Sequence, residues 1–216
     1  MSSVPKLIDV EARRRELAEA LWSVVIDDGL QAVSVRSVAA RAGVSAGSLR
    51  HVFPTRSDLV TYSAELIIAR ATERVLAHGS DDDSLPDALA ILCELLPLTP
   101  ESRTEVEVNT ALIAEATREP GLHGIRDRMY DAIGSLCRLI VTDFTLQESP
   151  RTDTRAADGG TGDPELDRAA KRLHALVDGV ALHLLHQPPG ADTGWATDLL
   201  AEELRSLGVS RSGRRG

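Results

Sequence analysis

Residues 34–58 read Ser-Val-Arg-Ser-Val-Ala-Ala-Arg-Ala-Gly-Val-Ser-Ala-Gly-Ser-Leu-Arg-His-Val-Phe-Pro-Thr-Arg-Ser-Asp and contain two short helical patterns separated by a turn. In the first pattern, apolar residues recur at spacings of three and four, which predicts one buried helix face. Ser34 is suited to cap this helix, and Gly43 to end it, because glycine tolerates the left-handed conformation of a helix stop. Ser45 is the expected N-cap of the second helix, which Pro54 ends.

The second helix has one apolar side and one polar side. Leu49, Val52 and Phe53 fall within about a third of a turn at 100° per residue. The opposite side carries small, polar and basic residues, namely Gly47, Ser48, Arg50 and His51. Two short helices joined by a glycine turn, the second with a basic outer face, predict a helix-turn-helix that binds DNA.

A longer pattern around this motif resembles a known family. Ala39-Ala40-Arg41-Ala42-Gly43-Val44-Ser45-x-Gly47-Ser48-Leu49-x-His51-x-Phe53-Pro54-x-Arg56-x-x-Leu59 is similar to the N-terminal signature of TetR-type one-component transcriptional regulators. The resemblance implies an all-α chain with a three-helix DNA-binding domain and a helical domain that binds an effector and dimerises. We therefore expect a helix-turn-helix domain at 1–56, a connecting helix at 57–78, an effector and dimerisation domain at 79–208, and a disordered tail at 209–216.

The remaining sequence also has helical periodicity. Helices are predicted for residues 10–28, 57–77, 86–96, 101–118, 122–146, 164–186, and from 191 or 192 to 207. Residues 149–163 have no apolar period and are rich in turn formers, which predicts a loop. Asp27 and Asp28 oppose the helix dipole at the end of the first helix, and no local pattern explains them.

The expected DNA contacts lie on or beside the motif. They are Arg36, Arg41, Ser45, Ala46, Gly47, Ser48, Arg50, His51, Thr55 and Arg56. Five of them suit contacts to phosphates, which fix register but carry no sequence information, namely Arg36, Arg41, Ser48, Thr55 and Arg56, whereas Ala46 and Gly47 could give only apolar or backbone contacts. Arg50 stands where the family commonly has tyrosine; it could pair with guanine O6 and N7 or clamp a phosphate, and we favour the base. His51 could contact either, so direct readout rests on these two residues.

The charge distribution agrees with this expectation although the net charge is −9. Residues 1–56 carry eight Lys or Arg and six Asp or Glu, a net charge of +2. The rest of the chain has a net charge of −11. Polyanion affinity depends on the local face rather than on the whole protein.

The last two predicted helices are candidates for a homodimer interface. The helix at 164–186 has an apolar stripe on one side and small or apolar residues on the other, which predicts burial on more than one face. With its successor it could form a four-helix bundle with a second chain, or a larger monomeric core. The expected interface residues are Ala175, Gly179, Leu182, His183, His186, Leu200 and Leu204. A two-fold dimer would read a near-palindromic operator in double-stranded DNA.

The resemblance also implies a small-molecule effector, bound in a pocket between the helices of the second domain. Inward-facing candidates are Asn109, Ile113, Met129, Ile133, Arg138 and Phe144, although core packing explains most of them equally well. No metal site is expected, because His183 and His186 share a helix face without a third ligand nearby. No cofactor is expected. Cys93 and Cys137 are interpreted as reduced thiols.

Two other functional classes fit the sequence less well. An enzyme is not expected, since the sequence has no Gly-rich phosphate loop, nucleophile elbow or H-E-x-x-H. A helical adaptor that does not bind DNA would not need the arginines around the motif. A ligand-responsive repressor is favoured over an activator. No apolar run approaches the length of a membrane span and no signal peptide is evident, so we expect no membrane partner and a cytoplasmic location.

Overall fold

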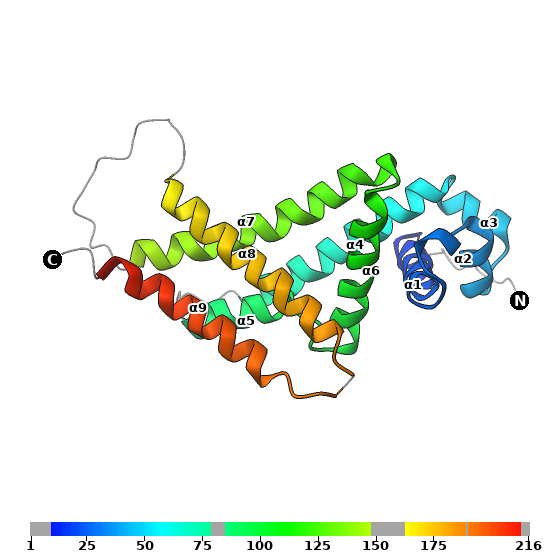
Figure 1. Ribbon diagram of the computed structural model, residues 1–216. Helices are drawn as coiled ribbons and strands as arrows, with labels where there is room; N and C mark the ends of the chain where they lie inside the picture. The colour runs from blue at the N-terminus through cyan, green and yellow to red at the C-terminus, as the bar shows by residue number, and fades with distance from the viewer. Residues whose placement is uncertain (1–9, 79–84, 148–162, 189, 213–216) are drawn as a thin grey trace, which may run out of the picture. The chain divides into compact units, whose positions relative to one another are not determined.

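Figure 1 shows the computed structural model of the chain, which describes residues 10–78, 85–147, 163–188 and 190–212. Side chains are described within these ranges except at residues 85–86, 144–147 and 208–212. Over this part of the chain, every regular element is an α-helix or a short 3-10 turn. The prediction of an all-α fold is therefore confirmed. The chain forms two compact units, Met1–Arg70 with Glu107–Asp127, and Ala71–Val106 with Arg128–Gly216.

The first unit contains the predicted helix-turn-helix. Its elements are α1 (Val10–Asp28), η1 (Leu30–Ala32), α2 (Val35–Arg41), α3 (Ala46–Val52) and the beginning of α4 (Arg56–Ala77). Their apolar faces meet in a core formed by Leu17, Leu21, Val38, Leu49, Phe53 and Leu59, all at most 2% exposed. Burial of these side chains supplies most of the favourable free energy that holds the short helices α2 and α3 together.

Local side-chain hydrogen bonds begin three of these helices. Ser34 and Ser37 form a capping box at the start of α2, and the Ser45 hydroxyl accepts from the Ser48 amide at the start of α3. Thr55 and Asp58 exchange backbone-to-side-chain hydrogen bonds at the start of α4. These contacts satisfy orphan amides in the first turn of each helix. Gly43 adopts a φ of 66° between α2 and α3, the left-handed conformation that its predicted role as a stop requires.

The second unit is built from the later helices. These are α5 (Leu85–Cys93), α6 (Pro100–Ala116), α7 (His123–Gln147), α8 (Pro164–Leu185) and α9 (Gly194–Ser212), with the turn η2 (Pro120–Leu122) before α7. The end of α6, η2 and the start of α7 belong to the first unit. In Figure 1, α8 and α9 run antiparallel, and Arg172 and Glu203 form an ion pair between them at 2.6 Å.

The core of the second unit is aliphatic. Its fully buried members include Leu92, Leu96, Val141, Leu173, Leu200 and Leu204. Helix boundaries agree with the predicted ones to within a few residues, except that α9 continues to Ser212. The predicted loop at 149–163 lies outside the described residues except for Asp163, which caps α8. The last residues of the predicted tail also lie outside them.

Candidate nucleic-acid interface

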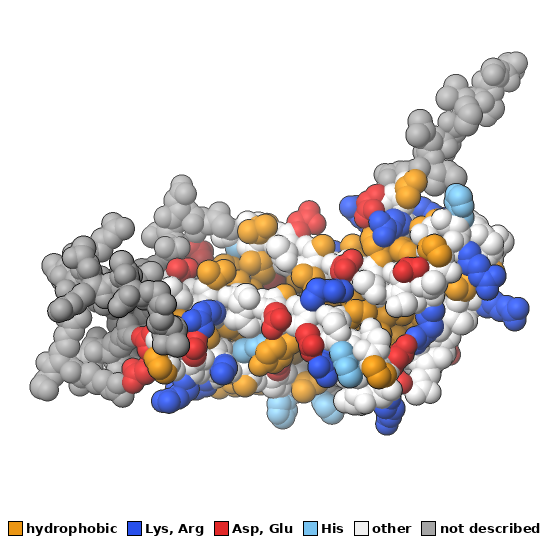
Figure 2. Space-filling model, turned by 90° about the horizontal axis from the view of Figure 1, so that it is seen from above, with side chains coloured by type: hydrophobic (Ala, Val, Ile, Leu, Met, Phe, Trp, Pro, Cys, Tyr) orange, Lys and Arg blue, Asp and Glu red, His pale blue; other side chains and the backbone are white. Residues whose placement is uncertain are grey.

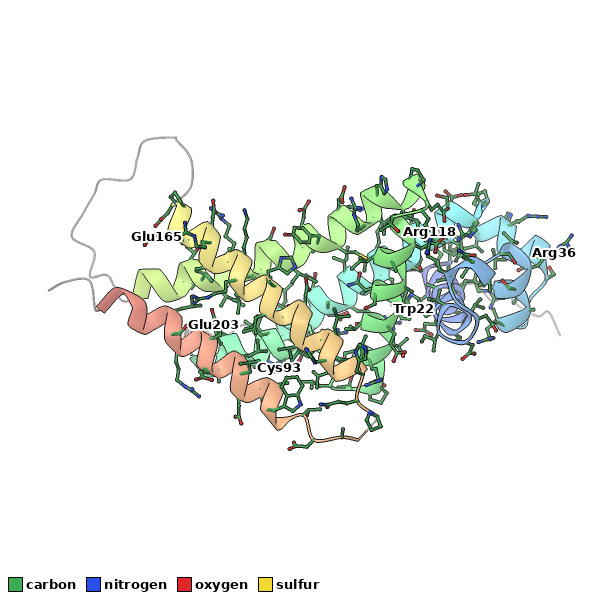
Figure 3. The ribbon with its side chains drawn as sticks, viewed as in Figure 1. Trp22, Arg36, Cys93, Arg118, Glu165 and Glu203 are labelled. Carbon is green, nitrogen blue, oxygen red and sulfur yellow. The ribbon has the colours of Figure 1, made fainter. Side chains whose placement is uncertain are left out.

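The outer face of α2 and α3 presents basic side chains without acidic partners. Arg36, Arg50 and His51 are exposed and, among the described residues, none pairs with a carboxylate. Figure 3 shows Arg36 pointing away from the core of α1, α2 and α3. Figure 2 shows basic side chains, drawn in blue, protruding from the surface of this unit. Unpaired cations on one face are what a phosphate backbone requires.

The start of α3 brings small side chains to the same surface. Ala46 is half-buried, whereas Gly47 and Ser48 are exposed. A Cβ added at Gly47 would lie 3.8 Å from the Ser45 hydroxyl oxygen, an ordinary contact. The protein interior therefore leaves room for a side chain at Gly47. A need for glycine here would have to come from the outside, where the backbone can approach a groove closely.

Arg41 is bound within the first unit. Its guanidinium donates to the carboxylates of Asp27 at 2.7 Å and Asp28 at 3.4 Å. This pairing explains the two acidic residues that are locally unfavourable at the end of α1. Their position against the helix dipole was the sequence signal that they had a partner elsewhere. A phosphate contact by Arg41 would have to compete with both.

Arg56 is also bound within the first unit. Its Nε donates to the Val33 carbonyl at 2.9 Å and its Nη2 to the Leu30 carbonyl at 3.2 Å. Its Nη1 donates to the Glu119 carboxylate at 2.9 Å. All three nitrogens thus have acceptors in the protein, and Glu119 is a partner that sequence reasoning missed. The Thr55 hydroxyl accepts from the Asp58 amide.

An aromatic and charged cluster joins α1 to α3 and α4. The Arg14 guanidinium lies over the rings of Tyr62 at 4.2 Å and Phe53 at 5.4 Å, as measured to the ring centroids. The Tyr62 hydroxyl donates to Glu11 at 2.6 Å. Burial, assisted by the hydrogen bond to the Glu11 carboxylate, raises the pKa of Tyr62 from 10 to about 12. These contacts hold the end of α3, the helix that carries Arg50, against α1 and α4.

We expect Tyr62 to ionise late. The chain has two tyrosines, so the phenolate absorbance of a Tyr130→Phe variant reports Tyr62 alone. In a rapid pH jump, completed before unfolding, its midpoint should lie at about pH 12, against about 10 in denaturant. The pKa of Tyr62 is higher in the folded protein than in the unfolded chain. Its contribution to the free energy of unfolding is therefore fully present below pH 10 and is lost as the pH rises through 12. Glu11→Gln should lower the midpoint, and a folded midpoint near 10 would contradict the geometry.

The six predicted effector residues are divided between the two units. Asn109 and Ile113 belong to the first, whereas Met129, Ile133 and Arg138 belong to the second. Met129 is buried, Ile113 is exposed, and Arg138 forms an ion pair with Asp167. The side chain of Phe144 lies outside the described residues. The set remains a prediction.

The predicted interface residues fall into two groups. Ala175, Leu182, His183 and His186 are exposed, and Gly179 is partly exposed, along one side of α8. Leu200 and Leu204 have no exposed surface, because they face the core of their own unit rather than outward. Helix α8 is therefore buried on one side only within a single chain. Within the described residues, no group of three or more His, Cys, Asp or Glu side chains could hold a metal ion, and no helix is long and apolar enough to cross a membrane.

Comparison with known proteins agrees with this geometry. Residues 17–62 match the family described as bacterial regulatory proteins, tetR family, and residues 86–209 match the BetI-type transcriptional repressor C-terminal family. The HTH-type transcriptional regulator PksA of Bacillus subtilis (strain 168) is 35% identical over 208 residues, 95% of each protein. The crystal structure of a transcriptional regulator from Rhodococcus sp. Rha1 has a TM-score of 0.71 at 26% identity, covering 90% of this chain and 95% of that one. The multidrug binding protein EbrR, complexed with imidazole, has a TM-score of 0.53 at 25% identity over 89% of each chain.

An all-helical chain with a helix-turn-helix that matches this family over its N-terminal residues is a DNA-binding transcriptional regulator. The chain belongs to the TetR family, with a C-terminal part of the BetI type. The resemblance found in the sequence is thereby confirmed. Membership of a family of regulators also confirms that the protein is not an enzyme.

Proposed function

We propose that the protein is a homodimeric repressor that binds a near-palindromic operator and is released by a small-molecule effector. The observation that carries this proposal is the exposed basic face of α2 and α3, where no carboxylate in the described part of the chain pairs with Arg36, Arg50 or His51. Elsewhere in the motif the arginines are neutralised by carboxylates. The cationic surface is therefore concentrated where a recognition helix would enter the major groove.

The contacts divide by chemistry. Arg50 reads a base, by pairing with guanine, and His51 contacts a base or a phosphate beside it. Arg36 and Ser48 bind phosphates and set the register. Ala46 and Gly47 allow the backbone to come close to the groove, and the exposed helix caps Ser45 and Thr55 are assigned to the same DNA contact surface. For Arg41 and Arg56, the observed ion pairs favour a role inside the protein.

The exposed side of α8 supports the dimer. Ala175, Gly179, Leu182 and His186 recur at spacings of four, three and four, so they form one stripe of a helix. Leu182 is 44% exposed, and Leu199 of α9 is 38% exposed. An apolar and small-residue stripe of this kind suits close packing against the same stripe of a second copy. Two copies of α3 then meet two half-sites.

Two similarities to known proteins support a small-molecule effector and support repression rather than activation. The C-terminal half matches a family described as a transcriptional repressor. EbrR, a relative of the same fold, is a multidrug binding protein and holds imidazole, so a small organic molecule is the class of effector that we propose. Effector binding favours a state in which the two DNA-binding domains no longer match the two half-sites of the operator. The affinity for the operator then falls by the coupling free energy. The protein would act in the cytoplasm, where the operator is.

The test is selection of bound fragments from the source genome by the purified protein. We expect enrichment of a near-palindrome with half-sites about one helical turn, or 10 base pairs, apart. Affinity for it should fall steeply as salt rises. Transcription from the recovered promoter then separates repression from activation. Failure to enrich any sequence, with no binding to duplex at low salt, would leave the helical adaptor as the better description.

A further inference from the structure

The turn that precedes α2 is held by two contacts, one to the last turn of α6 and one to the segment that follows α6. Arg56 binds the carbonyls of Leu30 and Val33 and the carboxylate of Glu119. Beside it, the Gln31 amide donates to the Glu115 carboxylate at 3.2 Å. The partners lie 63 and 84 residues apart in the chain. Both contacts lie inside the first unit, to which Glu107–Asp127 belongs.

This turn determines where α2 begins. The Ser37 hydroxyl donates to the Ala32 carbonyl at 2.8 Å, and the Ser34–Ser37 capping box follows directly. Helix α2 in turn packs against α3. A shift of this turn would therefore change the orientation of α3 toward DNA, even though the basic residues on the outer face of α2 and α3 stay the same.

The position of Arg56 argues for a dedicated role. It is the first residue of α4, where a positive charge opposes the helix dipole. Its side chain is 32% exposed and its nitrogens point at protein acceptors. The forked guanidinium joins two carbonyls and one carboxylate, a geometry that lysine cannot reproduce.

We infer that the Arg56–Glu119 ion pair is a positioning contact, which holds the turn before α2 against the turn after α6 and so sets the presentation of α3. The inference deepens the proposed function and rests on it for its DNA readout. Glu119 is the N-cap of η2 and follows the last residue of α6, Ala116, by three positions.

The first measurement does not involve DNA. Amide hydrogen exchange of the whole protein is compared for Arg56→Gln, Glu119→Gln and the control Arg13→Gln, which breaks an Arg–Glu ion pair within α1 and touches neither Glu115 nor Glu119. The Arg56 and Glu119 variants should speed exchange at residues 30–34 and 119–122 by at least about fivefold, as local opening becomes easier. Arg13→Gln should not. Unchanged exchange in both the Arg56 and the Glu119 variant would overturn the inference.

The second measurement separates positioning from phosphate contact. Binding to a random-sequence duplex is measured against salt concentration. Arg36→Gln, a phosphate contact, should lower the salt slope by about one per subunit. Arg56→Gln should weaken binding about fivefold, the scale of a partly exposed ion pair, and leave the slope unchanged.

Glu119→Gln gives the opposite sign under the two interpretations. If Glu119 positions Arg56, binding weakens. If it merely withholds Arg56 from a phosphate, binding tightens and the slope rises, which would overturn the inference. If the unmodified protein does not bind duplex DNA at all, the proposed function fails. The hydrogen-exchange result still decides separately whether the Arg56–Glu119 ion pair holds the turn before α2.

Discussion

Arg50→Ala should abolish discrimination among operator variants while binding to random-sequence duplex survives. Arg50 is exposed on α3 and, within the described residues, no carboxylate holds it. A bidentate pair with guanine is worth about 1–3 kcal/mol of discrimination. With two half-sites, the loss is about 2–6 kcal/mol, on the order of 30-fold to 10⁴-fold in the ratio of specific to nonspecific affinity. The measurement is that ratio at one fixed salt concentration.

The control is Arg50→Lys, which keeps the positive charge but removes the forked guanidinium group. It should retain nonspecific affinity and lose most of the discrimination, because a point charge cannot pair with O6 and N7 together. His51→Ala should reduce the ratio by a smaller factor. If Arg50→Ala weakens binding equally on every sequence and lowers the salt slope, Arg50 contacts a phosphate and the base readout belongs elsewhere.

Phe53→Ala should destabilise the first unit more than any change on its surface. Phe53 is 1% exposed and its ring centroid lies 5.3 Å from that of Tyr62, with Arg14 over the ring. Removing a buried phenylalanine costs about 3–5 kcal/mol, a large part of the 5–15 kcal/mol typical of a domain. The loss reaches function because Phe53 ends α3 and fixes it on α1 and α4.

The two tryptophans allow each unit to be followed separately. Trp22 lies in the first unit and Trp195 in the second. In a Trp195→Phe background, the Trp22 fluorescence transition in urea should move to a much lower midpoint on introducing Phe53→Ala. In a Trp22→Phe background, the transition reported by Trp195 should move little. Phe53→Leu keeps most of the apolar volume and should cost about 1–2 kcal/mol. A loss below about 1 kcal/mol for Phe53→Ala would contradict the packing.

The parts of this protein that sequence reasoning predicted correctly are local ones. Ser34 and Ser45 begin helices where expected, because a cap depends on residues two or three positions away. Gly43 ends α2 with a positive φ for the same reason. The spacing of apolar residues likewise locates the helices, because a helix that buries one face has apolar residues every three or four positions in the sequence.

The sequence therefore determined the all-α class, the helix-turn-helix in residues 34–58 and its basic outer face. The tertiary structure decided which of the basic residues are unpaired. Arg36, Arg50 and Arg56 look alike in the sequence, yet the carboxylate that binds Arg56 comes from Glu119, a partner that no local period reveals. The same holds for Leu182, which faces outward, and Leu200, which faces the core. An ion pair or a packed face depends on chain segments that only folding brings together.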